Sequence, residues 1–259
     1  MTPVAGTRIV LALGSTAQSA ASMAIALHLA REAQATLESV FVEDVDLLHL
    51  AALPFTQELG RTSGALRPLQ HAELEALLRR RAEQARRLIA EHALAARLEV
   101  SFRIARGTIA REAIAAAAHA EWVVVTESSA PPVARRPAGR ATSAPVAVVL
   151  EAGTPGGRAL ETAVKLARRT ASDVLVLLSS GKAADDSVAA RETFEQAQRS
   201  HPELAHALVL PLRDIRDALR EARRHGCQAV VVSPAARDDR GEVLLRLLEQ
   251  GACPVVIVR

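Results

Sequence analysis

Residues Ile9 to Ala30 form the stretch IVLALGSTAQSAASMAIALHLA. It begins as an apolar run of strand length, continues through a turn of small residues, and ends with the apolar spacing of a helix. Strand, turn and helix in this order are the usual geometry of a nucleotide-binding site. The turn, however, contains neither an acidic residue nor a glycine-rich phosphate loop. The stretch therefore predicts the architecture without predicting the nucleotide chemistry.

This unit occurs twice in the chain. Residues 8–42 are echoed by residues 145–179, and residues 97–125 are echoed by residues 205–232, with strand and helix in the same order. Short β-branched runs alternate with segments of helical period, which favours α/β units built on parallel sheets with helices on both faces. We predict strands at Arg8–Leu13, Thr36–Val42, Leu98–Ala105, Trp122–Thr126, Val146–Leu150, Asp173–Leu178, Ala207–Leu212, Ala229–Val232 and Val255–Val258. Helices are predicted near residues 17–33, 69–95, 109–119, 157–170, 184–199, 214–225 and 241–250.

The two copies predict two domains, at residues 1–143 and 144–259. The first includes an insertion at residues 43–69 and a Pro- and Arg-rich linker at residues 128–143. It has no fifth strand of its own before the second copy begins, so one copy keeps a bare sheet edge or borrows a strand. Apolar residues of the insertion would either cover the first crevice or offer a patch to another subunit; they are Leu47, Leu48, Leu50, Leu53 and Phe55.

Composition and charge exclude several classes of function. The net charge is only +3 with basic residues scattered along helices, and aromatic residues make up 2% of the chain, so we expect no nucleic-acid binding. No apolar run approaches the length of a membrane span and no signal peptide is evident, so we expect a cytoplasmic protein without a membrane partner. The eight histidines and two cysteines show no metal-ligand spacing, and no catalytic constellation is apparent.

Three segments together resemble the universal stress protein family, here as a tandem of two such domains. They are residues 8–42, residues 106–125 beginning RGTIAREA, and the ending LLRLLEQGACPVVIVR. The resemblance implies a Rossmann-like fold of the adenine nucleotide alpha hydrolase type, with an open five-stranded parallel sheet in each half and ligands at the carboxyl ends of the strands. It also implies, for members that bind ATP, an Asp after the first strand and a Gly-x2-Gly-x9-Gly-Ser/Thr loop after the fourth.

These ATP-binding features are eroded in this chain. The acidic position falls on Gly14 in the first copy and on Glu151 in the second. The second phosphate loop, SPAARDDRGE, begins at Ser233, retains only Gly241 and is several residues too short. A phosphate cradle needs glycines because a Cβ blocks the close approach of consecutive backbone N–H groups. We therefore expect no ATP binding of the family type in the second copy, and no cofactor overall.

The first copy leaves two interpretations open. The turn residues Gly14, Ser15 and Thr16 open a helix whose free N–H groups favour an anion. Arg135 and Arg136 would lie where the phosphate loop belongs, and guanidinium groups hold anions without glycines. Alternatively, these residues form an ordinary helix cap beside a solvated loop. Similarly, Glu151 would meet an adenine or ribose hydroxyl, or form a salt bridge with an arginine.

Two functional hypotheses follow. The first is a non-catalytic stress-response protein of the universal stress type, which binds a protein partner or a small ligand. The second is a nucleotide-binding protein for ATP or AMP with at most slow hydrolysis, using Glu151, Ser233 and Gly241 or the first turn with its two arginines. For either, the last strand, Val255–Val258, is predicted at a sheet edge, where it would pair with a second copy to form a homodimer.

Overall fold

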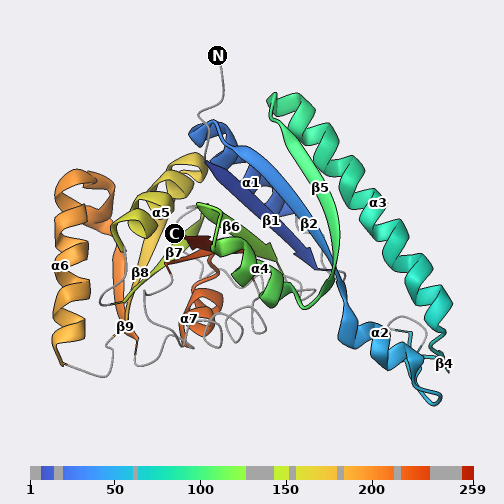
Figure 1. Cartoon of the computed structure of the whole chain (residues 1–259). Coiled ribbons are helices and arrows are strands. Elements are labelled where there is room, and N and C mark those ends of the chain that lie inside the picture. Colours follow the sequence, from blue (N-terminus) through green and yellow to red (C-terminus); the bar gives the residue numbers. More distant parts are fainter. Residues whose placement is uncertain are drawn as a thin grey trace.

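The computed structural model describes residues 7–14, 20–60, 64–126, 143–151, 156–179, 184–212, 217–233 and 253–259. Nine described strands form one sheet in the order β5-β2-β1-β6-β11-β10-β7-β8-β9 (Figure 1). Their bounds are β1 Arg8–Gly14, β2 Thr36–Asp44, β5 Val100–Gly107, β6 Trp122–Thr126, β7 Ser143–Leu150, β8 Ser172–Ser179, β9 Leu208–Leu212, β10 Ala229–Val232 and β11 Val255–Val258. A separate hairpin pairs β3 (Gln57–Leu59) with β4 (Leu66–Pro68).

The large sheet consists of two parallel sets of strands. One set is β5-β2-β1-β6 and the other is β11-β10-β7-β8-β9. They meet at β6 and β11, which pair antiparallel with Val124 opposite Val256. A mostly parallel sheet made of two such sets confirms the predicted α/β fold class.

Helices cover both faces of this sheet. One face packs against α1, α3, α5 and α6, whose buried residues include Leu29, Ile89, Leu160 and Phe194. The other face packs against α4 and α7. The bounds are α1 Ala20–Ala33, α2 Val45–Ala52, α3 His71–Ala96, α4 Ile109–Ala117, α5 Gly156–Thr170, α6 Ala184–Ser200 and α7 Ala218–Arg224, with a 3-10 turn at Pro202–His206.

The long helix α3 shows how the sequence period selects the covered face. Its buried residues recur every three or four positions, which places them on one stripe of the helix facing the sheet and α2. They are Leu74, Leu78, Ala82, Ala85, Ile89 and Ala93. The helix ends at Arg97, whose left-handed backbone allows its N–H to reach the carbonyls of Ala93 and Leu94.

The predicted elements agree with the described structure, with two exceptions. Each of the nine predicted strands is present within three residues of its predicted bounds, and the largest difference is the start of β7 at Ser143. The insertion forms α2 and the β3–β4 hairpin, which the sequence patterns did not predict. The helix predicted near residues 241–250 and all of the predicted linker except Ser143, which begins β7, lie outside the described residues.

The last strand has a different partner from the predicted one. The sequence predicts Val255–Val258 at an edge of the second sheet, and β11 is the outermost strand of the second set. That edge pairs with β6 of the first copy and not with a second chain, so β11 lies in the interior of the nine-stranded sheet, between β10 and β6. All four of its residues are buried, because a strand with helices over both faces and neighbours on both sides has no exposed side. The two separate five-stranded sheets implied by the family resemblance are also absent: among the described strands the first set has four, and its β6 pairs with a strand of the second copy.

Side-chain contacts reinforce this junction between the two sets. The indole Nε1–H of Trp122 in β6 donates to the Thr162 hydroxyl in α5 over 3.1 Å, within the buried core. Arg158 in α5 donates to the backbone oxygen of Arg259 over 2.8 Å and forms an ion pair with Glu121. The two sequence copies are therefore packed together through main-chain pairing, a buried hydrogen bond and an ion pair.

Candidate functional site

Two crevices follow from the strand order. In an open parallel sheet, a ligand crevice forms at the carboxyl ends where the strand order reverses. In the first set this point lies between β1 and β6, at Gly14 and Thr126. In the second set it lies between β7 and β10, at Glu151 and Ser233. Three of the residues predicted to bind a ligand therefore lie at these two positions: Gly14, Glu151 and Ser233.

The first crevice is described only at the strands themselves. Gly14 is buried at the end of β1, opposite Val42 of β2, while the preceding Leu13 lies opposite Thr126 of β6. The remaining predicted site residues of this crevice lie outside the described residues; they are Ser15, Thr16, Arg135 and Arg136. The hypothesis of an anion site at this turn therefore stays a prediction.

In the second crevice, the structure gives Ser233 a structural role. Its hydroxyl donates to the carbonyl oxygen of Val258 over 3.0 Å, and the residue is only 6% exposed. This bond joins the end of β10 to the end of β11. Glu151 lies on the same edge of the sheet, because Val149 of β7 pairs with Val232 of β10. Its side chain is partly exposed. Gly241, predicted beside them, lies outside the described residues.

The predicted residues do not form one site. Gly14 belongs to the first set, whereas Glu151 and Ser233 belong to the second. Strands β1 and β7 are four strand spacings apart, which corresponds to roughly 19 Å across the sheet. Each crevice must therefore be judged by itself.

The acidic residues at the end of β2 are engaged in local structure. Asp44 caps α2, with a carboxylate oxygen accepting from the backbone N–H of Asp46 over 2.9 Å. Glu43 is buried and forms an ion pair with Arg106 of β5 over 2.9 Å. The hydrogen bond that Arg106 donates to the Glu43 carboxylate raises the pKa of the Arg106 guanidinium. Arg106 also reaches Glu75 on α3 over 3.4 Å.

Arg106 is a residue that the sequence interpretation overlooked. It lies directly opposite Glu43 in the β2–β5 register. Opposite charges facing each other on neighbouring strands are the signal that could have identified this pair once the register was known. The pair connects the sheet edge to α3, so it anchors the region where the insertion begins.

The described residues offer no metal centre and no thiol nucleophile. No three His, Cys, Asp or Glu side chains in this part of the chain are grouped so as to hold a metal ion. Burial raises the pKa of the Cys227 thiol from 9.0 to about 12, with Cys253 adding to the effect. Burial likewise raises the pKa of Cys253 to about 11. Both cysteines are therefore protonated and unreactive near neutral pH.

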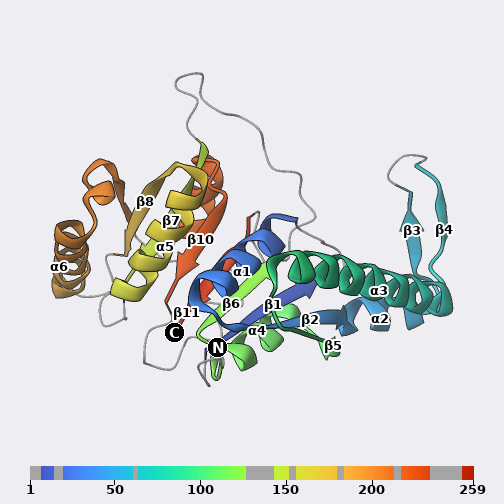
Figure 2. The ribbon, with the colours of Figure 1, turned by 90° about the horizontal axis from the view of Figure 1, so that it is seen from above.

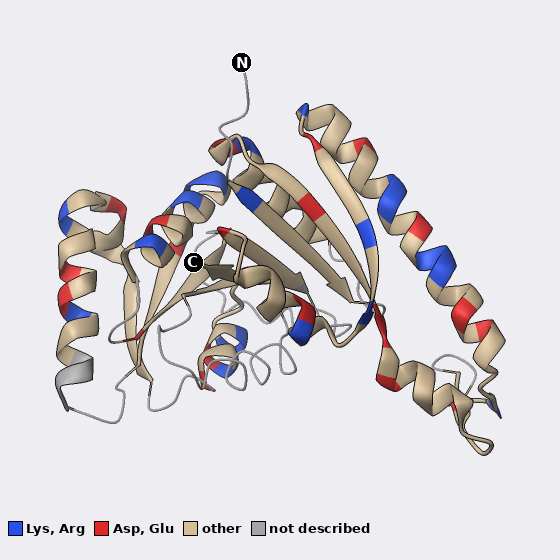
Figure 3. Cartoon of the chain, viewed as in Figure 1, with Lys and Arg blue, Asp and Glu red and all other residues tan. Residues whose placement is uncertain are grey.

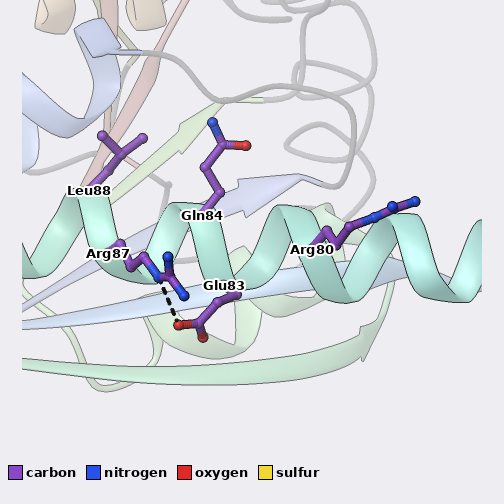
Figure 4. Close-up of a pocket in the computed structure, with 5 residues that line it drawn as sticks. All are labelled: Arg80, Glu83, Gln84, Arg87 and Leu88. Atoms are coloured by element: carbon purple, nitrogen blue, oxygen red, sulfur yellow. Dashed lines mark hydrogen bonds and ion pairs between the residues drawn. The ribbon is translucent and has the colours of Figure 1, made fainter.

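One shallow hollow lies on α3. Its volume is about 370 Å³, and its described lining comes from that helix alone: Arg80, Glu83, Gln84, Arg87 and Leu88. Figure 4 shows Gln84 and Leu88 pointing to one side of the helix while Arg87 pairs with Glu83 along it, over 3.1 Å. Three of the predicted ligand residues are described by the structure, Gly14, Glu151 and Ser233, and none of them is in this lining.

Charges of both signs alternate over the described surface. Figure 3 shows basic and acidic residues interspersed along α3, α5 and α6, with no long stretch of one sign. Many are paired along or between helices, as in Lys165 with Glu161 over 2.8 Å. None of the described helices combines the length and apolarity needed to cross a membrane.

Comparison with known proteins yields structural similarities only. No protein-family model and no curated protein matches the sequence. Among solved structures, a universal stress protein from Archaeoglobus fulgidus DSM 4304 has 10% identity and a TM-score of 0.49, over 97% of this chain and 96% of that one. A putative universal stress protein from Pseudomonas aeruginosa UCBPP-PA14 has 14% identity and a TM-score of 0.49, over 98% and 93%.

A shorter match covers less than half of the chain. The universal stress protein from Archaeoglobus fulgidus, solved in complex with dAMP, has 20% identity and a TM-score of 0.37, over 45% of this chain and 98% of that one. These three structures are described as universal stress proteins, which is the family that the sequence resembles. At such identities and TM-scores, they assign neither an activity nor a ligand to this chain.

Proposed function

We propose that the chain is a non-catalytic protein of the universal stress type, which acts in the cytoplasm by binding a protein partner or a small ligand. The observation that carries the proposal is the state of the second crevice. The fold has the strand-order reversal that creates a ligand crevice, but the hydroxyl of Ser233 is donated to Val258. The loop that follows lacks the glycines that a phosphate cradle needs.

The physical argument rests on where donors for a triphosphate would come from. A triphosphate is held by several backbone N–H groups turned toward it, and these require residues without a Cβ at close approach. In the second copy the corresponding positions are Ala235, Ala236 and Arg237, followed by two aspartates. The aspartates add negative charge that repels a triphosphate unless a divalent cation lies between them, which is why Mg²⁺ is included in the test.

Calorimetric titration of the full chain with ATP and Mg²⁺ tests this proposal. We expect no saturable heat at millimolar nucleotide. Thermal unfolding gives a second readout, because a ligand present at 100 times its Kd stabilises the native state by about 2.7 kcal/mol. An unchanged midpoint is expected with ATP, ADP or AMP. Saturable binding with a Kd in the micromolar range would overturn the proposal.

The nucleotide-binding hypothesis remains the second candidate, and the placement of Glu151 favours it. This carboxylate follows β7 at the reversal point beside β10, where a ribose or adenine contact is expected. Under this hypothesis, nucleotide co-purifies with the protein and is seen by native mass spectrometry. Glu151→Gln would then weaken binding by about tenfold, the size expected for one lost hydrogen bond to a charged group. Glu161→Gln, on the outer face of α5, serves as the control.

A further inference from the structure

The insertion forms a structured arm beyond the sheet. We define the arm as α2 together with the β3–β4 hairpin, which Figures 1 and 2 show beside one end of α3 and away from the nine-stranded sheet. One side of α2 is buried against α3, where Leu48 and Ala51 pack on Leu74 and Leu78. This contact fixes the arm to the body of the protein.

Hydrogen bonds hold the arm in one conformation. The Thr56 hydroxyl donates to the carbonyl oxygen of Leu50 over 2.7 Å, joining the hairpin to α2. The N–H of Leu69 donates to the carbonyl oxygen of Thr56 over 2.9 Å and closes the base of the hairpin. Arg67 and Glu58 form an ion pair across the two strands. A surface on the arm is therefore preorganised, which lowers the entropy cost of binding.

The arm exposes five large apolar side chains, which together we call its apolar side. Leu59 and Leu66 lie opposite each other in the hairpin register and share one face, while the Glu58–Arg67 pair occupies the other. Phe55, between α2 and the hairpin, is 91% exposed. The five large apolar side chains of this surface are all more than half exposed: Leu50, Leu53, Phe55, Leu59 and Leu66.

We infer that this apolar side of the arm is the contact surface for a second copy of the same chain. At their exposed fractions the five side chains present roughly 420 Å² of apolar area per copy, taking about 100 Å² for a fully exposed leucine side chain and about 200 Å² for a phenylalanine. A stable interface needs about 800 Å² per partner, so the arm supplies about half of it. A two-fold axis places this surface against itself, which buries apolar area on both copies.

The net charge of the arm favours a second copy of the chain over an anionic partner such as a lipid surface or a nucleic acid. Residues 45–69 contain two acidic and two basic residues, so their formal charge is zero. The surface therefore neither repels its own copy nor attracts a lipid surface or a nucleic acid, both of which select basic segments. Two of its described charges, Glu58 and Arg67, also pair with each other within the arm.

The strand edges of the sheet are less suited to pairing with a second copy. β11, the strand from which we predicted dimerisation, is enclosed between two neighbours. The true edges are β9 and β5. β9 contains Pro211, which lacks the N–H needed for a continuous ladder, and β5 exposes Arg103 and Arg106. Both features protect an edge from pairing, although each edge also exposes one large apolar side chain, Ile104 in β5 and Leu208 in β9. The arm holds half of the ten large apolar side chains that the described residues expose.

The inference is tested by the molar mass of the full chain, measured by light scattering after size-exclusion chromatography. The arm variant is Leu53→Ser/Phe55→Ser. We expect a particle of twice 27.5 kDa for the wild type and dimerisation at least 100-fold weaker for the variant. The matched control is Leu94→Ser/Val188→Ser, which removes two exposed apolar side chains from α3 and α6 and leaves the dimer intact. Circular dichroism verifies that each variant is folded.

Three results would overturn the inference. One is a wild-type mass of 27.5 kDa at every concentration up to about 100 µM. Another is an arm variant that dimerises as tightly as the wild type. The third is a monomer that binds phosphatidylcholine vesicles through Phe55, since the surface would then dock on lipid. Hydrogen exchange locates the contact. Amide exchange in residues 45–60 should slow as the protein concentration rises. Slower exchange confined to β5 or β9 would also overturn the inference. None of these results depends on whether ATP binds.

Discussion

The junction at β6 and β11 and the arm are both rich in large apolar residues, yet they end in opposite environments. At the junction, Val124 and Val256 are fully buried between helices on the two faces of the sheet. On the arm, Phe55 and Leu66 are exposed. The difference shows that an apolar run is buried only when the fold supplies neighbours on every side. Among the described elements, the main contacts of the arm are with α3 and β5, both through α2.

The largest expected effect comes from placing a charge at the junction. Val256→Asp buries a carboxylate between β6 and β10, where no water reaches it, and we expect a loss of more than about 4 kcal/mol in the free energy of unfolding. Leu66→Asp makes the same kind of change on the arm and should cost less than about 1 kcal/mol. Urea denaturation of both variants measures this contrast. Equal losses would show that the junction is not the better packed region.

The cysteines report on opening of the junction. Cys227 and Cys253 come just before β10 and β11. With pKa values of about 12 and 11, their thiolate fractions at pH 8 are at least about 100-fold below that of a free thiol with a pKa of 9.0. We expect a thiol reagent to label the native chain at least 100-fold more slowly than the urea-unfolded chain. Comparable rates would mean that the start of β11 opens readily.

The same thiols set a pH dependence. Their pKa values in the folded state lie above the unfolded value, so the native state retains these protons to higher pH than the unfolded state does. Their contribution to stability is complete below about pH 9 and declines as the pH rises toward 11 and 12. The midpoint of urea unfolding should therefore fall above pH 9, and a variant with both cysteines replaced by alanine should fall less steeply.

A smaller effect is expected from the hydrogen bond that crosses the junction. Trp122→Phe keeps an aromatic ring but removes the donor to Thr162, which should cost about 1 to 2 kcal/mol. Thr162→Val removes the acceptor without adding bulk. In the double variant the two losses should not add, because each removes the same bond. Full additivity would show that the bond contributes nothing to stability.

The smallest effect is expected on the arm itself. Phe55→Ser changes a side chain that contacts little within its own copy, so the free energy of unfolding should shift by less than about 0.5 kcal/mol at nanomolar protein. Dilution keeps the chain below any dimerisation range, so the measurement isolates the single copy. Fluorescence of Trp122 during urea unfolding provides the signal. A loss above 2 kcal/mol would mean that Phe55 packs within its own chain.

The contrast also explains which parts of the fold were predictable from the sequence. Strands such as β1 and β10 are short runs of β-branched and apolar residues bounded by turns, and this local signal was sufficient. The location of β11 required information about neighbours. The run Val255–Val258 is apolar at every position, which is typical of an interior strand, whereas β9 contains a proline and β5 exposes arginines. That comparison among strands would have placed β11 correctly.

The candidate site was less predictable because ligand groups lie on loops. The sequence identified the strand ends at Gly14 and Glu151 because they follow apolar runs directly. It proposed Ser233 as a ligand contact, but whether a hydroxyl faces a ligand or a neighbouring strand depends on register. Likewise, the pairing of Glu43 with Arg106 joins residues far apart in the chain, and no local pattern encodes such a pair.

The antiparallel pairing of β6 with β11 also affects how the chain folds during synthesis. More than a hundred residues separate Thr126 from Val255, so β6 emerges from the ribosome several seconds before its neighbour, at about 5 to 20 residues per second. Throughout that interval the nascent first half presents an unpaired edge of consecutive valines, which is the kind of surface that aggregates or recruits chaperones. Closing the sheet by inserting β11 into its centre is also a contact of very long sequence separation, which slows folding.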